Sequence, residues 1–216
     1  MSKQIKAIIF DFDGVVINSE PLYEQTGREL FRQYGVEISD NDWQEFRGLT
    51  ANDFFYLAKK KFNLTADIAE ISELDHKILK NKFSKQLNYI SGFNQFFENI
   101  KSNYQTALVT STSQHLLEWI YTNTKINNHF NISITGSDVN NPKPHPEPFQ
   151  KTAKILKICP TEMIVIEDSV NGVISAKEAG SKVIGFLTSF DRKILKDADY
   201  FAKDYSEVEE IVANLY

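Results

Sequence analysis

Short apolar runs rich in β-branched residues recur along the chain and alternate with segments of helical spacing. Most of these runs are almost continuous in apolar residues, which is typical of parallel strands covered on both faces. They lie at 5–10, 105–110, 132–135, 163–167 and 182–186, with a weaker run at 199–202. Helices are predicted at 91–103, 111–124, 145–158 and 170–180. This alternation predicts an α/β fold built on a doubly wound parallel sheet.

The interval 18–89 interrupts the alternation, because it has few strand-like runs and much helical spacing. Helices are predicted at 20–35 and at about 66–88, and capping-box patterns at 39–42 and 50–53 predict two further helix starts. We therefore expect an α/β core formed by 1–17 and 90–216. The residues 18–89 are expected to form a helical domain inserted after the first strand.

The composition argues against several kinds of partner. The chain has 24 Lys and Arg against 29 Asp and Glu, and no basic block predicts a nucleic-acid surface. No apolar stretch approaches the roughly 20 residues that a membrane span needs, and the N-terminal segment does not resemble a signal peptide. We therefore expect a cytoplasmic protein, monomeric or weakly dimeric, that binds neither nucleic acid nor membranes.

Several common catalytic and cofactor motifs are missing from the sequence. The four histidines form no HxxxH or HExxH pair, no serine stands in GxSxG, and neither GxGxxG nor GxxxxGK[ST] occurs. These absences argue against a histidine metal site, an α/β-hydrolase, a dinucleotide site and a P-loop. The single cysteine, Cys159, cannot form an internal disulfide, and its position after an apolar helix predicts that it is buried.

Polar side chains follow the predicted strands at the points where these strands end. They are Asp11 and Asp13 after the first strand, Thr110 and Ser111 after the second, Glu167 and Asp168 after the fourth, and Lys143 between prolines in a loop. The Asp-Gly pair is also an ordinary turn signal, so the first two aspartates alone favour a turn and a site equally. Functional residues of open parallel sheets gather beyond the carboxyl ends of the strands. The full set therefore predicts a site at this edge.

The predicted edge gathers four carboxylates, which repel one another and raise each other's pKa values. A hard cation explains such a cluster, and oxygen-only ligands suit Mg²⁺. If Asp13 is protonated, Mg²⁺ and Lys143 together balance the charge of the other three carboxylates. Thr110 and Ser111 lead into a predicted helix N-terminus, which favours anions such as phosphate.

Four motifs, taken in order, resemble those of the haloacid dehalogenase superfamily in its β-phosphoglucomutase-like phosphatase branch. DFDGVV resembles the first motif, LVTSTS the second, PKPHPEPF the lysine motif and VIEDSVNGVISAKEAG the acidic motif. The resemblance covers nearly the whole core. It implies a Rossmann-like core with a small helical cap, and a Mg²⁺-dependent phosphatase that acts on a small-molecule phosphate ester.

The resemblance also implies catalytic and phosphate-binding roles. Asp11 would be the nucleophile that takes up the phosphoryl group as an aspartyl phosphate. Asp13 would protonate the leaving oxygen and then activate water for the second step. Thr110, the Ser111 amide and Lys143 would bind the phosphoryl oxygens.

The metal ligands implied by the resemblance come from the same edge. The Asp11 carboxylate, the Asp13 main-chain carbonyl and Asp168 would hold Mg²⁺. Glu167 would be a ligand either directly or through a water molecule, and the sequence leaves this choice open.

In the helical domain, Arg47, Gly48 and Thr50 are candidates for substrate contacts, although a solvated Arg47 is an equally good interpretation. β-Phosphoglucomutases carry an arginine where this chain has Ala51 and a histidine where it has Tyr23. These departures favour a phosphatase of a sugar, polyol or glycolate phosphate. A phosphosugar mutase of the β-phosphoglucomutase type is the alternative, and a non-catalytic phosphate-ligand binder is the third possibility.

Overall fold

The computed structural model describes residues 4–46, 49 and 51–215 of the chain. The chain divides into two compact units, an α/β unit formed by Met1–Asn18 with Asn88–Tyr216 and a helical unit formed by Ser19–Leu87. These borders lie one or two residues from the predicted ones.

The α/β unit contains a six-stranded sheet in which every neighbouring pair is parallel. The strands are β1 (Ala7–Phe10), β2 (Gln105–Val109), β3 (Ser133–Ile134), β4 (Met163–Glu167), β5 (Lys182–Phe186) and β6 (Tyr200–Ala202), in the order β3-β2-β1-β4-β5-β6. The predicted parallel α/β sheet is therefore confirmed. The chain extends the sheet from β1 in both directions, so the strand order reverses beside β1.

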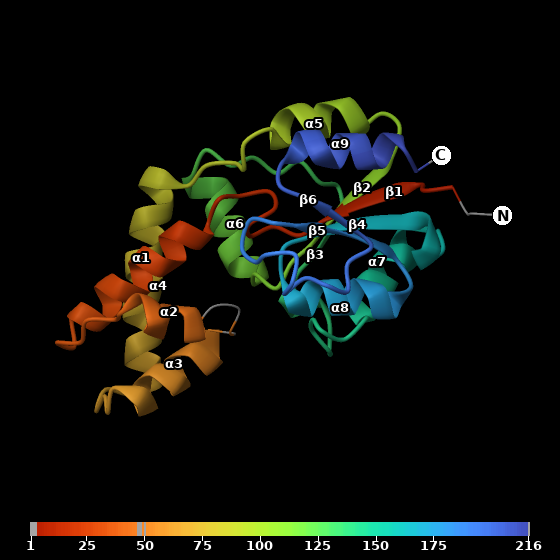
Figure 1. Ribbon diagram of the computed structural model, residues 1–216. Helices are drawn as coiled ribbons and strands as arrows, with labels where there is room; N and C mark the ends of the chain where they lie inside the picture. Colours follow the sequence, from red (N-terminus) through yellow and green to blue (C-terminus); the bar gives the residue numbers. More distant parts are fainter. Residues whose placement is uncertain (1–3, 47–48, 50, 216) are drawn as a thin grey trace. The chain divides into compact units, whose positions relative to one another are not determined.

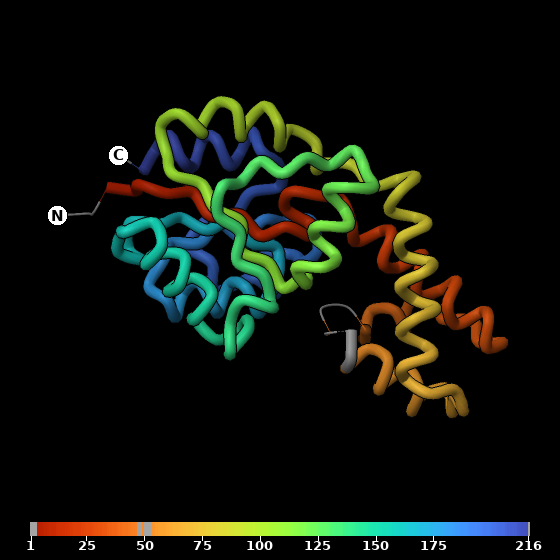
Figure 2. The backbone as a smooth tube through the Cα atoms, turned by 180° about the vertical axis from the view of Figure 1, so that it is seen from behind, coloured from red at the N-terminus to blue at the C-terminus, as the bar shows by residue number. Residues whose placement is uncertain are grey.

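Helices cover both faces of this sheet (Figure 1). On one face α5 (Phe93–Ile100) and α9 (Tyr205–Ala213) lie side by side in both views, and Asn99 donates a hydrogen bond to Glu209 at 2.9 Å (Figure 2). On the other face lie α7 (Glu147–Leu156) and α8 (Val170–Ala179). The helix α6 (Gln114–Asn123) connects β2 to β3, and short 3₁₀ helices lie at η1 (Gly136–Asp138) and η2 (Pro160–Glu162).

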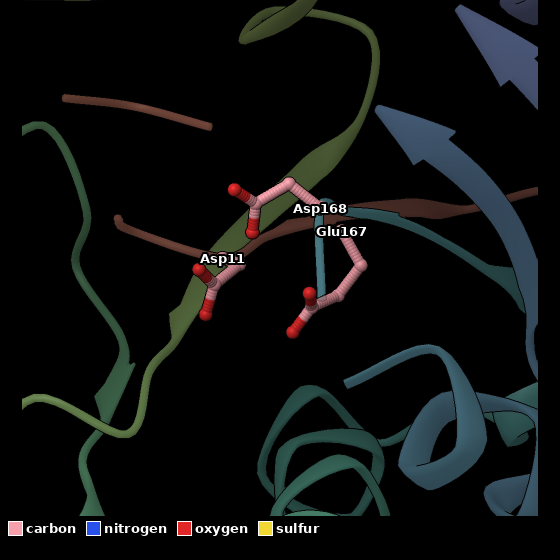
Figure 3. Close-up of side chains that lie close together, drawn as sticks. All are labelled: Asp11, Glu167 and Asp168. Carbon is pink, nitrogen blue, oxygen red and sulfur yellow. The ribbon is translucent and has the colours of Figure 1, made fainter. Parts of the chain in front are cut away.

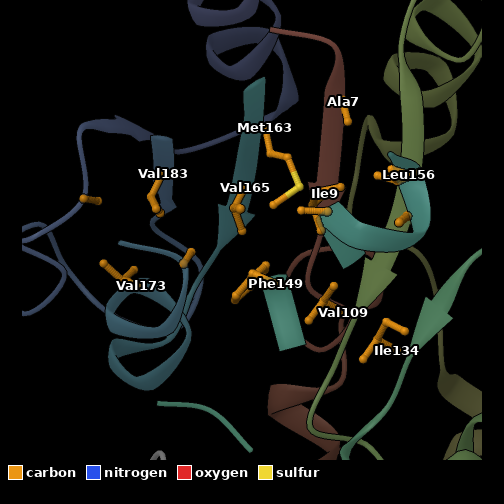
Figure 4. Close-up of a cluster of buried hydrophobic side chains, with 14 of the residues drawn as sticks. Ala7, Ile9, Val109, Ile134, Phe149, Leu156, Met163, Val165, Val173 and Val183 are labelled. Atoms are coloured by element: carbon orange, nitrogen blue, oxygen red, sulfur yellow. The ribbon is translucent and has the colours of Figure 1, made fainter. Parts of the chain in front are cut away.

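Alternation along the strands divides the buried side chains between the two faces. Ile9, Val109 and Val165 point toward α7 and α8, where they belong to one cluster with Phe149 and Val173 (Figure 4). On the opposite face the Phe10 ring lies 5.4–6.1 Å from four other rings, those of Phe93, Phe96, Phe97 and Phe130. Truncating such a buried ring to Ala costs roughly 3–5 kcal/mol, so β1 is held firmly from both sides.

The helical unit consists of α1 (Glu20–Arg32), α2 (Asp40–Phe46), α3 (Ala51–Lys61) and α4 (Ile68–Gln86). Its buried cluster includes Leu30 and Phe31 of α1 and Ile71 and Ile78 of α4. The capping box predicted at 39–42 is confirmed, because Ser39 N donates to Asp42 Oδ2 at 2.9 Å and Asp42 N donates to Ser39 Oγ at 3.2 Å. The second pattern includes Thr50, which lies outside the described residues.

Two local predictions were incomplete or wrong. Cys159 is exposed instead of buried. The helix that precedes it ends at Leu156, and Lys157 takes a left-handed conformation with φ of 58°, so the chain turns away before it reaches the cysteine. The helix α9 was not predicted, although Asp204 caps it by accepting a hydrogen bond from Glu207 N at 3.0 Å.

Among the described residues, no helix combines the length and the apolar character that crossing a membrane requires.

Candidate active site

The register of the sheet brings polar residues level at one edge. Phe10 pairs with Leu108 on one side and with Ile166 on the other. The next residue, Asp11, continues the ladder by donating its N–H to Ile166 O at 3.0 Å. Its side chain therefore emerges at the carboxyl edge of the sheet, beside the ends of β2 and β4.

The chain turns sharply after Asp13. Gly14 has φ of +72°, and its N–H donates to Ile17 O at 2.8 Å. A Cβ atom at Gly14 would also overlap the carboxylate of Asp168. Glycine is required here for its backbone conformation and for the space that Asp168 occupies. The predicted turn is present, and it brings the chain against the acidic side chain of the residue that follows β4.

Three buried carboxylates meet at this edge (Figure 3). Asp11, Glu167 and Asp168 each offer one carboxylate oxygen, and these oxygens all lie within 4.8 Å of one another. Glu167 has no exposed surface, and the other two are nearly as well buried. Like charges this close are stable only where a cation or a proton neutralises them.

Lys143 supplies one cation to the cluster. Its side chain is 5% exposed, and its Nζ donates at 2.6 Å to both Asp11 Oδ1 and Glu167 Oε1. A third hydrogen bond goes to Val109 O at 2.9 Å, and the ammonium lies 5.4 Å from the centre of the Phe149 ring. Burial alone would lower the pKa of Lys143, but the charges of Asp11 and Glu167 hold that pKa above its usual value. The side chain is therefore a permanent positive charge at the end of β2.

One ammonium does not neutralise three carboxylates. Burial raises the pKa of Asp11 well above its usual value. Lys143 opposes this rise, and the negative charges of Glu167 and Asp13 add to it. The donor set, oxygen-only and with negative charge in excess, fits a hard divalent cation such as Mg²⁺.

The two neighbouring acids at the end of β4 have different partners. Both oxygens of Glu167 are engaged by protein groups, Oε1 by Lys143 and Oε2 by the N–H and hydroxyl of Ser169, each at 2.9 Å. Asp168 Oδ2 accepts a hydrogen bond from the hydroxyl of Ser189, and the neighbouring Thr188 hydroxyl donates to Gly14 O at 2.7 Å. Glu167 thus anchors the lysine, whereas Asp168 is held from the loop after β5.

The predicted phosphate-binding residues Thr110 and Ser111 lie in the loop between β2 and α6. Thr110 is buried, and its N–H donates to Ile134 O at 2.9 Å. Ser111 is exposed. The helix begins later than predicted, because Ser113 is its N-cap and accepts a hydrogen bond from Leu116 N at 3.3 Å.

The substrate contacts predicted in the helical unit, Arg47, Gly48 and Thr50, lie outside the described residues. The structure brings the other predicted site residues to one edge of the sheet. These are Asp11, Asp13, Thr110, Ser111, Lys143, Glu167 and Asp168.

Sequence reasoning missed several residues that support this edge. Thr188 and Ser189 lie just beyond Phe186, the last residue of β5, so the rule that located the other site residues could have located them as well. Tyr205 donates its hydroxyl to Val15 O at 2.8 Å and thereby anchors the turn after Asp13. No local signal pointed to Tyr205, because its partner lies 190 positions away in the chain.

The chain is similar to known proteins along most of its length. The family model described as haloacid dehalogenase-like hydrolase matches residues 8–186. The chain is 28% identical over 197 residues to the phosphorylated carbohydrates phosphatase of Thermotoga maritima. The match covers 90% of this chain and 91% of that protein. It is 27% identical over 209 residues to the validoxylamine A 7'-phosphate phosphatase of Streptomyces hygroscopicus subsp. limoneus, with 94% and 95% covered.

A solved structure is similar along the whole chain. It comes from Thermotoga maritima and is provisionally named as a β-phosphoglucomutase. The TM-score is 0.83 at 25% sequence identity, and the match covers 98% of this chain and 100% of that one. The similarity therefore includes the helical unit as well as the sheet.

Proposed function

Because the chain belongs to the haloacid dehalogenase-like hydrolase family, we propose that it is a Mg²⁺-dependent phosphatase of a small phosphomonoester. One observation carries the proposal. Asp11, Glu167 and Asp168 form a buried acidic cluster, and the ammonium of Lys143 forms ion pairs with two of its carboxylates. A sugar or polyol phosphate is the favoured substrate class, because two similar proteins are named as phosphatases of a phosphorylated carbohydrate and of validoxylamine A 7'-phosphate. Glycolate phosphate remains within the proposed range.

The proposed reaction has two steps, and both use the first acidic motif. An Asp11 oxygen attacks phosphorus, and the bond from phosphorus to the ester oxygen breaks. Asp13 donates its proton to that oxygen as the alcohol leaves. Asp13 then takes a proton from water, which attacks the aspartyl phosphate and releases inorganic phosphate. Asp11 is thereby regenerated as a carboxylate, and Asp13 is again protonated.

The proposed phosphate-binding groups come from two loops of the α/β unit. The Thr110 hydroxyl and the Ser111 amide, beyond β2, would donate to two phosphoryl oxygens, and Lys143 would balance part of their charge. Asp11, the Asp13 main-chain carbonyl and Asp168 would hold Mg²⁺, with Glu167 as a direct or water-mediated ligand. When bound, the ion would stabilise the negative charge of the transferring phosphoryl group.

The helical unit is proposed to act as a cap that selects the substrate through Arg47, Gly48 and Thr50. The test is a double Arg47→Ala/Thr50→Ala variant, which should change the order of preferred substrates in a panel of phosphate esters. A matched control is Arg32→Ala, which breaks an exposed ion pair of 3.0 Å with Glu37 in the same unit. Identical substrate profiles for the double variant and the wild type would remove these residues from substrate recognition.

The central experiment measures phosphate release by the wild-type protein with Mg²⁺ on p-nitrophenyl phosphate and a panel of sugar, polyol and glycolate phosphates. We expect turnover that a chelator abolishes and that Mg²⁺ restores. The Asp11→Asn variant should lose at least about 10³-fold in turnover, since it removes the nucleophile. Full activity in that variant would exclude Asp11 as the nucleophile.

The same panel separates the other candidate functions. A mutase would convert β-glucose 1-phosphate into glucose 6-phosphate without net release of phosphate. A non-catalytic binder would bind Mg²⁺ and a phosphate analogue but turn over no compound. A cytoplasmic location and a monomeric or weakly dimeric state are also proposed, and cell fractionation and sedimentation velocity test them.

A further inference from the structure

Thr112 makes a short hydrogen bond to an acid of the first motif. Its Oγ1 donates to Asp13 Oδ2 at 2.6 Å, although the two residues are 99 positions apart in the chain. Thr112 is 9% exposed, so water competes little for this contact. A hydrogen bond of this length to a carboxylate oxygen is at the strong end of the range for hydroxyl donors.

Thr112 is itself held in place by its backbone. Its N–H donates to Thr110 Oγ1 at 3.0 Å, and Thr110 N is fixed to Ile134 O of β3 at 2.9 Å. The Thr112 hydroxyl is therefore attached to the sheet through two hydrogen bonds in series. A carboxyl group that accepts from such a rigid donor loses much of its freedom to rotate about its side-chain bonds.

We infer that Thr112 is a positioning residue for Asp13, which it holds in the orientation needed to protonate the leaving oxygen. The inference rests on the proposed phosphatase function. Thr112 would not touch the reacting atoms, because its hydroxyl hydrogen is directed to Asp13 Oδ2. Its removal would therefore impair proton transfer to the leaving group more than transfer of the phosphoryl group itself.

The test compares two substrates that differ mainly in how much they need an acid. The nitrophenolate of p-nitrophenyl phosphate leaves readily without a proton, whereas the phenolate of phenyl phosphate is a much poorer leaving group. The parameter kcat/KM for each reports the steps up to release of that group. A general acid contributes about 10²–10⁴-fold. We expect Thr112→Val to lower kcat/KM about 10-fold for phenyl phosphate and less than about 2-fold for p-nitrophenyl phosphate.

Three further variants make the test specific. Thr112→Ser keeps the hydroxyl and should restore the wild-type ratio of the two substrates. Thr112→Ala removes the hydroxyl without the bulk of Val and gives the same comparison if the Val variant does not fold. Ser113→Ala is the matched control, because it removes the neighbouring hydroxyl that caps α6 and should leave the ratio unchanged.

The possible outcomes separate this inference from the proposed function. The positioning role is overturned if the wild type releases phosphate but Thr112→Val lowers kcat/KM equally for both substrates, or for neither. Failure of Thr112→Ser to restore the ratio, or the same selective loss in Ser113→Ala, would overturn it as well. If the wild type releases no phosphate from either substrate with Mg²⁺, the proposed function itself fails, and this inference fails with it.

Discussion

Lys143 donates a hydrogen bond to Glu167 at 2.6 Å, and 24 positions of sequence separate the two residues. Glu167 has no exposed surface, and the lysine side chain is 5% exposed. Since the same ammonium also contacts Asp11 at 2.6 Å, it forms ion pairs with two buried carboxylates at once. Such pairs contribute little net stability as a whole, but removing one partner leaves the other charge buried and uncompensated.

Replacing the lysine should therefore destabilise the protein strongly. We expect Lys143→Met to lower the free energy of unfolding by about 3–5 kcal/mol at neutral pH, measured by urea denaturation. Added Mg²⁺ should recover part of this loss, because a second cation then meets the uncompensated carboxylates. A variant as stable as the wild type without Mg²⁺ would mean that Asp11 and Glu167 do not depend on this ammonium.

Binding of Mg²⁺ should be visible without any substrate. We expect Mg²⁺ to raise the melting temperature of the wild type, with a stabilisation of about 2.7 kcal/mol at a concentration 100 times the Kd. The Asp168→Asn variant should lose most of this response, because it removes one of the three clustered carboxylates. Asp40→Asn is the control, since that side chain is 93% exposed in the helical unit, and it should respond like the wild type. An unchanged response in Asp168→Asn would exclude this carboxylate as a metal ligand.

Two glycines with the same backbone conformation allow the cost of backbone strain to be distinguished from the cost of steric crowding. Gly14 has φ of +72° and Gly35 has φ of +73°, but a Cβ at Gly14 would overlap Asp168 whereas one at Gly35 meets nothing within 4 Å. Gly35→Ala should lower the free energy of unfolding by about 1–2 kcal/mol, the cost of a left-handed conformation for a residue with a Cβ. Gly14→Ala should cost more and should also weaken the response to Mg²⁺, because Asp168 must move. The explanation would be contradicted if both variants lost the same free energy of unfolding and were stabilised equally by Mg²⁺.

The helical unit contains an acid that should oppose folding at high pH. Burial raises the pKa of Asp75, on α4, from 3.8 to about 7. Between these two values the folded state binds more protons than the unfolded state, so the contribution of Asp75 to stability falls as the pH rises from about 4 to about 7. Above this window its ionised form is destabilising by a constant amount, about 1–2 kcal/mol after allowance for its partial exposure.

The Asp75→Asn variant tests this pH dependence directly. Its free energy of unfolding should match that of the wild type at about pH 4 and exceed it by about 1–2 kcal/mol at about pH 8. Asn81→Ala, an exposed change of an uncharged residue on the same helix, should give a difference that is the same at both pH values. If the Asp75→Asn difference is also independent of pH, the titration of Asp75 is not linked to folding.

Much of the fold could be predicted from local patterns. The six apolar runs became the six strands, because nearly continuous apolar residues between amphipathic segments are stable only between two helical layers. The positions of Asp11, Thr110 and Asp168 followed from the strands, since the carboxyl ends of parallel strands lie at one edge. The helix α9 was missed. Cys159 was placed in the interior, because the left-handed conformation of one residue, Lys157, decides where the chain turns at the end of α7.

The sequence by itself determined which residues could carry charge and hydrogen bonds at the edge of the sheet. The tertiary structure alone decided how they pair: Thr112 with Asp13 over 99 positions, Ser189 with Asp168 over 21, and Tyr205 with Val15 over 190. Hydrophobic periodicity is a local property that can be read along the chain. These pairs depend instead on strand order, on register and on the loops between strands, which are established only when the whole sheet assembles.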